Sequence, residues 1–299
     1  MPLSIVAQWF TRRQGLALGI ASTGVGAGTA LVPLLVAYLI SAYDWRVTYA
    51  IVGILVCLIC LPASLMAMRR PEDGYVQAYE AKKTAGADAS KSGDGNPGLS
   101  FVEAVSMTQF WFLFAIFALC MLALGGITVH IVAYALDAGL PAMVAAGLLT
   151  TIGVGSILGR VASGALSDKV GTKPVLALCL VVQGMAVLWL TKAGEPWMLY
   201  LFAAFFGISY GGCIPMIPKM TSQLFGLRSM GAIFGGISVA DGIGFAVGPF
   251  VAGYIFDITG SYHISFLTFA GAVFAAVILA LLLRPPKKAS ALPGDLPER

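Results

Sequence analysis

Hydrophobic residues are arranged along the chain in eight long runs that turn or charged positions separate. A bilayer core about 30 Å thick is crossed by about 20 apolar residues in a helix, and each run reaches that length. The runs cover residues 15–42, 47–68, 110–136, 141–167, 174–193, 197–224, 231–256 and 264–284. The pattern therefore predicts an all-α, polytopic membrane protein with about eight transmembrane helices in a lipid bilayer.

Composition supports this class and excludes several others. Hydrophobic residues make up 59% of the 299 residues and charged residues only 11%, whereas soluble domains carry roughly 25% charged residues. The mean hydropathy is +0.89, and the 36 glycines suit close contact between helices in lipid. These values exclude a cytosolic protein, a disordered tail and a disulfide scaffold.

The residue types that carry chemistry argue against catalysis, cofactors and nucleic acid. The chain has two histidines and no readable nucleophile–base arrangement, so we expect neither an enzyme nor a cofactor. The net charge of +4 is small and scattered, which argues against a nucleic-acid partner. Five cysteines, including the Cys57–Cys60 pair, fall inside apolar runs, and we expect inert buried thiols rather than a metal or redox site.

Basic residues are distributed unevenly between the two sides of the predicted bundle. Fourteen Lys and Arg residues lie in one set of loops and tails, and only Arg46 and Lys192 lie in the opposite set. Positive residues concentrate on the cytoplasmic side of membrane proteins. We therefore expect both termini to be cytoplasmic, in a multi-pass protein of the cell membrane.

Two interruptions are longer than a tight turn. The segment from 69 to 109 contains a small, polar stretch at 81–98 that is typical of a flexible linker. Ser100 and Glu103 then have the spacing of a capping box, which predicts a short interfacial helix before the third run. The second interruption is the tail, so two runs precede the linker and six follow it.

A ten-residue segment after the fourth run carries a family signature. Residues 164–173 read GALSDKVGTK, which resembles the G-x-L-[AS]-D-[RK]-x-G-x-[RK] signature of major facilitator superfamily transporters. In this segment Gly171 can adopt a left-handed conformation, and Asp168 can accept hydrogen bonds from the N-terminus of a neighbouring helix. The matching positions are Gly164, Asp168, Lys169, Gly171 and Lys173.

The resemblance implies an arrangement for the whole chain. In that superfamily the signature lies between helices 2 and 3 and again between helices 8 and 9, and a long loop joins helices 6 and 7. The eight runs then resemble helices 5–12 of an expected twelve, without the N-terminal helices that a complete pathway needs. This implies the remainder of an N-terminal bundle at 1–68, a cytoplasmic linker at 69–109, a C-terminal six-helix bundle at 110–284 and a tail at 285–299.

A narrower resemblance covers both ends of the chain. Trp9–Gly19 is similar to the W/Y-F-x-x-R-x-x-L-A-x-G stretch of the monocarboxylate transporter branch. Val129–Ala135, Gly159–Arg160 and Gly248–Tyr262 are similar to bacterial members of that branch and of the neighbouring oxalate/formate antiporter branch.

Arg160 is an ionisable residue within a run, where it is costly and therefore a candidate for function. Ser156, Ser163 and Ser167 share its helical face, and we expect this polar stripe to face a water-accessible hollow between two bundles. Arginine is suited to bind a carboxylate through two hydrogen bonds, and the monocarboxylate branch uses an arginine at the matching place. The alternative is that Arg160 only braces the bundle.

Asp241 is the second ionisable residue deep within a run. It is a candidate proton carrier or a partner for Arg160 in the empty site, and structural pairing without a transport role is the alternative. In the oxalate/formate branch the matching position is typically a lysine, so an aspartate here argues against a two-cation site for a dianion.

Three further residues complete the candidate set. His130, near the outer end of its run, can gate entry or shuttle a proton, or can be bonded to a backbone carbonyl. Tyr210 can offer a hydroxyl to the substrate site or serve only in packing. We expect Lys219, close to the inner end of its run, to reach toward the membrane surface.

Together these observations predict a secondary active transporter of small organic anions. We expect monocarboxylates as substrates, held by Arg160, with proton coupling through Asp241. Two alternatives stay open: an efflux or general solute carrier in which Arg160 is structural, and a fragment that does not transport because helices are missing.

Overall fold

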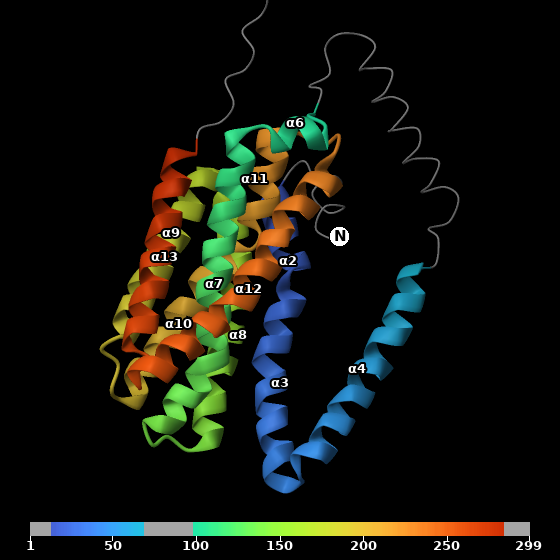
Figure 1. The fold of residues 1–299 in the computed structure, drawn as a ribbon. Helices are drawn as coiled ribbons and strands as arrows, with labels where there is room; N and C mark the ends of the chain where they lie inside the picture. The colour runs from blue at the N-terminus through green and yellow to red at the C-terminus, as the bar shows by residue number, and fades with distance from the viewer. Residues whose placement is uncertain (1–12, 69–97, 284–299) are drawn as a thin grey trace, which may run out of the picture.

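The computed structural model describes residues 13–68 and 98–283 (Figure 1). Expectations for residues 1–10, for most of the linker and for the tail lie outside the described residues. Within them, eight segments are long and apolar enough to cross a membrane. The predicted all-α, polytopic architecture is confirmed.

Helices in the described chain match the predicted runs, with two runs divided into two helices each. They are α2 (Gln14–Ala21), α3 (Thr23–Ala42), α4 (Trp45–Met68), α6 (Phe101–Val105), α7 (Thr108–Asp137), α8 (Ala142–Val170), α9 (Thr172–Leu190), α10 (Pro196–Cys213), α11 (Met216–Phe225), α12 (Met230–Thr259) and α13 (His263–Leu282).

Proline explains one of the two divisions. Within the sixth run, helix α10 ends at Cys213 and helix α11 begins at Met216, and Pro215 lies between them. Proline lacks a backbone donor and interrupts the hydrogen-bond ladder, so the helix is interrupted here. By contrast, α12 continues as one helix through Pro249. The first run divides at Ser22, between α2 and α3.

Helices α7 to α13 enclose one apolar core. Its largest fully buried apolar side chains are aromatic and include Phe202, Phe206, Phe266 and Phe269. The short helix α6 leads into α7 as predicted: Ser100 Oγ accepts from the Glu103 backbone amide, and the Glu103 carboxylate accepts from the Ser100 amide at 2.7 Å. These bonds, the one from the Ser100 amide first, lower the pKa of Glu103.

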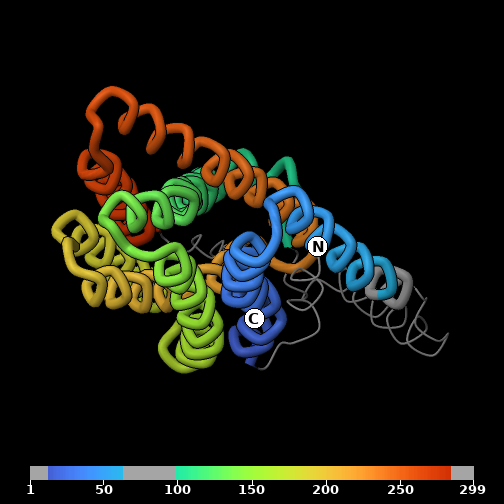
Figure 2. Tube along the Cα trace, turned by 90° about the horizontal axis from the view of Figure 1, so that it is seen from below, coloured from blue at the N-terminus to red at the C-terminus, as the bar shows by residue number. Residues whose placement is uncertain are grey.

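Segments before and after the linker meet along α8. Viewed along the helices, α3 lies beside α8, whereas α4 diverges from the rest (Figure 2). Glycines permit the contact because a β-carbon on Gly15 or Gly164 would collide with the other helix's backbone. Helices can approach closely in lipid only where such small residues meet.

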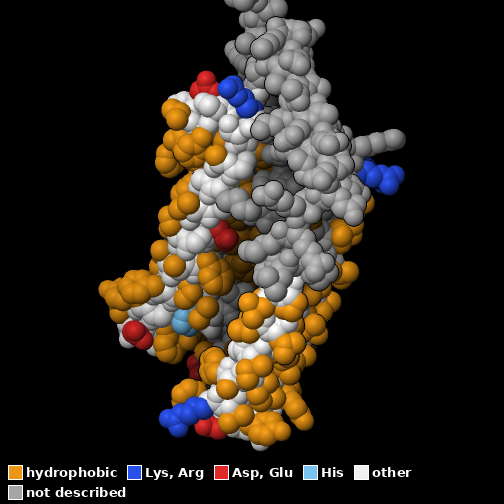
Figure 3. Space-filling model, turned by 90° about the vertical axis from the view of Figure 1, so that its right-hand side faces the viewer, with side chains coloured by type: hydrophobic (Ala, Val, Ile, Leu, Met, Phe, Trp, Pro, Cys, Tyr) orange, Lys and Arg blue, Asp and Glu red, His pale blue; other side chains and the backbone are white. Residues whose placement is uncertain are grey.

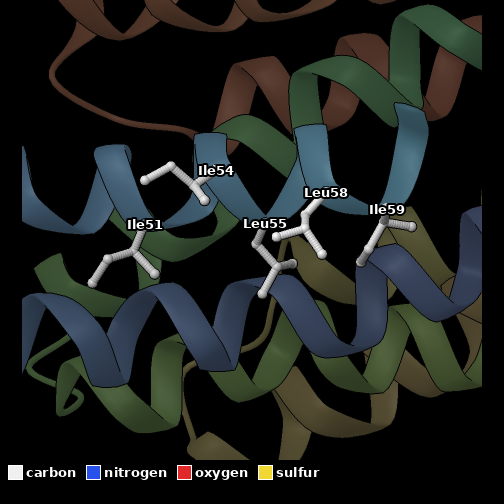
Figure 4. Close-up of a pocket in the computed structure, with 5 residues that line it drawn as sticks. All are labelled: Ile51, Ile54, Leu55, Leu58 and Ile59. Atoms are coloured by element: carbon white, nitrogen blue, oxygen red, sulfur yellow. The ribbon is translucent and has the colours of Figure 1, made fainter. Parts of the chain in front are cut away.

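The far helix α4 leaves much of its apolar surface uncovered. Five of its residues line an open pocket without polar groups (Figure 4): Ile51, Ile54, Leu55, Leu58 and Ile59. Cys57 and Cys60 are exposed on the same helix, so the expectation that all five thiols are buried is wrong. Cys120 and Cys213 are buried, as expected.

Charge is distributed as a bilayer requires. On the described part of the face in Figure 3, hydrophobic side chains make up most of the surface, and the visible Lys and Arg side chains lie toward its two ends. A transmembrane protein presents such an apolar surface to the lipid tails.

Candidate functional site

Arg160 lies in α8 with its side chain fully buried, at 0% exposure. Its Nη1 donates to Ser156 Oγ at 2.8 Å, and its Nη2 donates to Tyr210 Oη at 3.3 Å. The guanidinium carbon lies 5.4 Å from the centre of the Tyr210 ring, within range of a cation–π contact. The two candidates Arg160 and Tyr210 are therefore brought together.

The guanidinium has no negatively charged partner among the described residues, and one of its three nitrogens has no hydrogen-bond partner. The nitrogen without a partner is the buried Nε. Burying a charge without a counter-ion is costly, and buried polar atoms are normally hydrogen-bonded. The arrangement is therefore one that an anion would complete.

The serine stripe beside Arg160 faces protein rather than water. Ser156, Ser163 and Ser167 are all buried, and Ser163 Oγ donates to the Gly212 carbonyl of α10 at 3.1 Å. Gly26 of α3 packs against Arg160 from the other side. The stripe thus turns inward as predicted. The expected water-accessible hollow is not found beside Arg160 in the described part of the chain, because the side chain has no exposed surface and residues of α3 and α10 pack against it.

Asp241 of α12 does not pair with Arg160. The residue is exposed, and no ion pair joins it to any described cation. The alternative in which Asp241 is the partner of Arg160 is therefore not the arrangement found in this conformation.

His130 joins two helices at the end of the bundle opposite the signature segment. Its Nε2 lies 3.1 Å from the Pro249 carbonyl and its Nδ1 lies 3.3 Å from Tyr262 Oη. A carbonyl only accepts, so Nε2 donates, and Nδ1 of the neutral ring accepts from Tyr262. Burial raises the pKa of Tyr262, helped by Asp137 and Asp257. The alternative of a histidine bonded to a backbone carbonyl is the arrangement found.

The signature segment, residues 164–173, closes the other end of the bundle. Gly171 has φ +102°, the left-handed backbone predicted for it. Asp168 accepts from the backbone amides of Gly15 and Leu16, at 2.9 and 3.1 Å. These amides belong to the first turn of α2, where the helix dipole favours a carboxylate, so the predicted capping of a neighbouring helix is found.

Lys219 also contacts the signature segment, and its side chain does not point where we predicted. Its side chain is 6% exposed, and its Nζ lies 2.6 Å from Asp168 Oδ1 and 2.9 Å from Ser167 Oγ. Lys219 therefore does not reach toward the membrane surface, because a partly buried carboxylate and a buried hydroxyl are available beside it.

The signature segment itself contains two lysines, Lys169 and Lys173, and their surroundings differ. Lys173 Nζ donates to the carbonyls of Leu281 and Leu283, both at 2.8 Å. It thus satisfies carbonyls that the end of α13 leaves open. Lys169 is exposed and forms no ion pair with a described residue.

The described residues contain no cluster of three or more His, Cys, Asp or Glu side chains that could hold a metal ion.

Comparison with known proteins gives the family. A model of the Major Facilitator Superfamily matches residues 1–171 and 143–297. The chain is 27% identical over 302 residues to monocarboxylate transporter 12 of Mus musculus, across 94% of this chain and 62% of that protein. It is 28% identical over 286 residues to monocarboxylate transporter 13 of Bos taurus, across 95% of this chain and 63% of that protein.

A third relative is similar at the same level. Monocarboxylate transporter 11 of Mus musculus is 28% identical over 281 residues, across 89% of this chain and 58% of that protein. The chain thus spans about three fifths of the length of the curated relatives it matches. The family points to a transporter rather than an enzyme, and the chain belongs to the major facilitator superfamily, in which it is monocarboxylate transporter-like.

Proposed function

We propose that the protein is a secondary active transporter of small organic anions, with monocarboxylates as substrates. One observation carries this proposal: a fully buried guanidinium in a membrane-spanning helix has no carboxylate partner among the described residues and keeps an unused Nε–H. A single carboxylate would neutralise the positive charge of the guanidinium, and its two oxygens can accept two of the guanidinium N–H bonds. The printed names of the relatives support the same substrate class.

The free edge of the guanidinium defines how a carboxylate would bind. Nη1 is occupied by Ser156, whereas Nε is free and Nη2 makes only a 3.3 Å bond to Tyr210. Nε–H and an Nη2–H are parallel donors on one edge of the planar group, which fits the two oxygens of a carboxylate. The Tyr210 hydroxyl accepts a hydrogen bond from Nη2 and can donate its own proton to the bound oxygen.

Asp241 is proposed as the proton carrier of this site. It lies inside a membrane-spanning helix, where an ionisable residue is costly and therefore has a functional role by default. It is exposed rather than paired in this conformation, so it is free to exchange a proton. Protonation would remove its negative charge before a carboxylate approaches Arg160, which is the physical basis for symport.

The proposed mechanism is alternating access between two bundles, one that contains residues 1–68 and one at 110–284, joined by a linker at 69–109. The end of the bundle that carries Asp168 and Lys219 is assigned to the cytoplasmic side of the cell membrane, because basic residues concentrate there.

A second candidate function is a general solute carrier in which Arg160 only braces α8 against α10. The complete burial of Arg160 and its bonds to Ser156 and Tyr210 favour this candidate. The two candidate functions predict different effects of replacing Arg160 by lysine, which conserves the charge. Carboxylate transport should fall only if Arg160 binds the substrate.

Uptake of radiolabelled L-lactate into proteoliposomes separates the two candidates. Arg160→Lys keeps the charge but removes the bidentate edge, so we expect lactate uptake to fall by about 10- to 100-fold, as loss of a charged hydrogen bond implies. Arg228→Lys, at an exposed arginine, serves as the matched control and should transport normally. Full uptake by Arg160→Lys would contradict the proposed role.

A further inference from the structure

Gly26 is the residue of α3 that contacts the guanidinium of Arg160. A β-carbon on Gly26 would lie 2.7 Å from each of three side-chain atoms: Arg160 Nη1, Ser156 Oγ and Ile157 Cγ1. Ordinary contacts between carbon atoms are about 3.5–4.0 Å long. No side chain therefore fits at position 26 while α3 lies against α8.

The atoms that Gly26 faces have little freedom to move away. Nη1 of Arg160 is bonded to Ser156 Oγ, which in turn donates to the Gly153 carbonyl at 2.8 Å. Arg160 and Ser156 are both 0% exposed. A side chain at position 26 would therefore disturb the hydrogen bond between Arg160 and Ser156 or push α3 away from α8.

The requirement for glycine is confined to one face of α3. Gly24 and Gly28 flank Gly26 in the same helix, and a β-carbon on either would have no atom within 4 Å. Helix propensity alone would favour alanine at all three positions. Of these three positions, only at Gly26 would alanine collide with Arg160.

Backbone contacts continue on both sides of Gly26. A β-carbon on Gly19 would meet the Arg160 carbonyl, and one on Gly153 would meet the backbone of Ala30. Thr150 Oγ1 also donates to the Ala30 carbonyl at 2.8 Å. The backbone of α2 and α3 therefore covers α8 at the depth of Arg160.

We propose that Gly26 is a positioning residue that allows α3 to close over Arg160 and seal the substrate site. The site is reached when α3 separates from α8 at Gly26 and is occluded when the two helices meet there. This inference rests on the proposed role of Arg160 in binding an organic anion.

The test compares Gly26→Ala with Gly28→Ala in lactate transport and lactate binding. Alanine at position 26 acts as a wedge that opposes closure, so we expect turnover to fall at least about tenfold, because closure is a step of each transport cycle. The equilibrium dissociation constant for radiolabelled L-lactate should change by less than about threefold, since the binding edge of Arg160 remains. Gly28→Ala should match the parent in both measurements.

A second substitution makes room for the wedge. Ile157→Ala removes one of the three atoms that the new β-carbon would meet, and we expect it to restore part of the turnover of Gly26→Ala. If Gly26→Ala does not reach the membrane, Gly26→Ala/Ile157→Ala is compared with Ile157→Ala alone. A lower turnover of the pair supports the inference, and equal turnover overturns it.

The outcomes distinguish this inference from the proposed function. Lactate binding that depends on Arg160, together with equal turnover of Gly26→Ala and Gly28→Ala, overturns the role of Gly26 and leaves the substrate assignment intact. Failure of the parent protein to bind lactate overturns the proposed function, and the role of Gly26 with it.

Discussion

The Nζ atom of Lys219 in α11 lies 2.6 Å from Oδ1 of Asp168, the carboxylate that also caps the first turn of α2. One ion pair thus connects three helices, from segments on both sides of the linker. Gln14 adds a further bond, from its Nε2 to Ser222 Oγ at 3.2 Å. This end of the bundle is held by polar contacts, whereas the middle is held by glycine packing.

We predict that Lys219→Met lowers stability by about 1–3 kcal/mol, less than the cost of breaking a fully buried pair because the Asp168 side chain is 18% exposed. Combined with Asp168→Asn in a double-mutant cycle, the pair should show a coupling energy of about 0.5–3 kcal/mol. The measurement is thermal unfolding in detergent, followed by intrinsic fluorescence.

Lys169→Met is the matched control because Lys169 is exposed and forms no ion pair with a described residue. It should leave the unfolding midpoint nearly unchanged. Additive effects of Lys219→Met and Asp168→Asn would show that the observed proximity contributes no energy.

Helix positions were predictable because a bilayer sets the length of an apolar run. The run at 231–256, for example, became α12 at Met230–Thr259. The partner of Lys219 was not predictable in this way, since hydropathy gives the depth of a residue on its own helix but not its neighbour 51 positions away. A signal existed: Asp168 and Lys219 both lie near the inner ends of their runs, where opposite charges can meet.

The sequence predicted that Ser156 lies beside Arg160 but not how the guanidinium is enclosed. Helical spacing placed Ser156 beside Arg160, and a 2.8 Å bond joins them. The covering of Arg160 by Gly26 depends on how α3 packs against α8, and the spacing of residues within one helix contains no such information. For the same reason, the separation of Asp241 from Arg160 could not be read from their depths.

We predict that His130 stabilises the contact between α7 and α12 and does not set the pH dependence of transport. Tyr262→Phe removes one hydroxyl but keeps the ring stacked on Phe256, with centres 4.3 Å apart. It should cost about 0.5–1.5 kcal/mol, the net value of one hydrogen bond. The pH profile of lactate uptake should be unchanged in Tyr262→Phe and in His130→Gln. A shifted profile in either variant would instead assign a proton-transfer role to His130.

The capping box of α6 should respond to pH through Glu103. The folded protein lowers the pKa of this carboxyl from its ordinary value of 4.5. A lowered pKa means that the stabilisation is present above the unfolded value and is lost as pH falls through the folded value. Hydrogen exchange of residues 100–105, corrected for intrinsic rates, should therefore accelerate as the solution is acidified below about pH 4.5. Glu103→Gln keeps an acceptor at this position and should abolish the pH dependence; if the dependence persists, another group is responsible.

Lys173 should hold the end of α13 against the start of α9. Its ammonium group donates to two carbonyls, those of Leu281 and Leu283, and such charged hydrogen bonds contribute about 1.5–3 kcal/mol when fully formed. Because Lys173 is partly exposed, we expect Lys173→Met to cost less than that, and to accelerate hydrogen exchange in residues 279–283. Lys173→Arg keeps donors and charge and should preserve most of the protection, while Lys169→Met should preserve all of it. Equal exchange in Lys173→Met and Lys169→Met would mean that the end of α13 is held by its apolar packing alone.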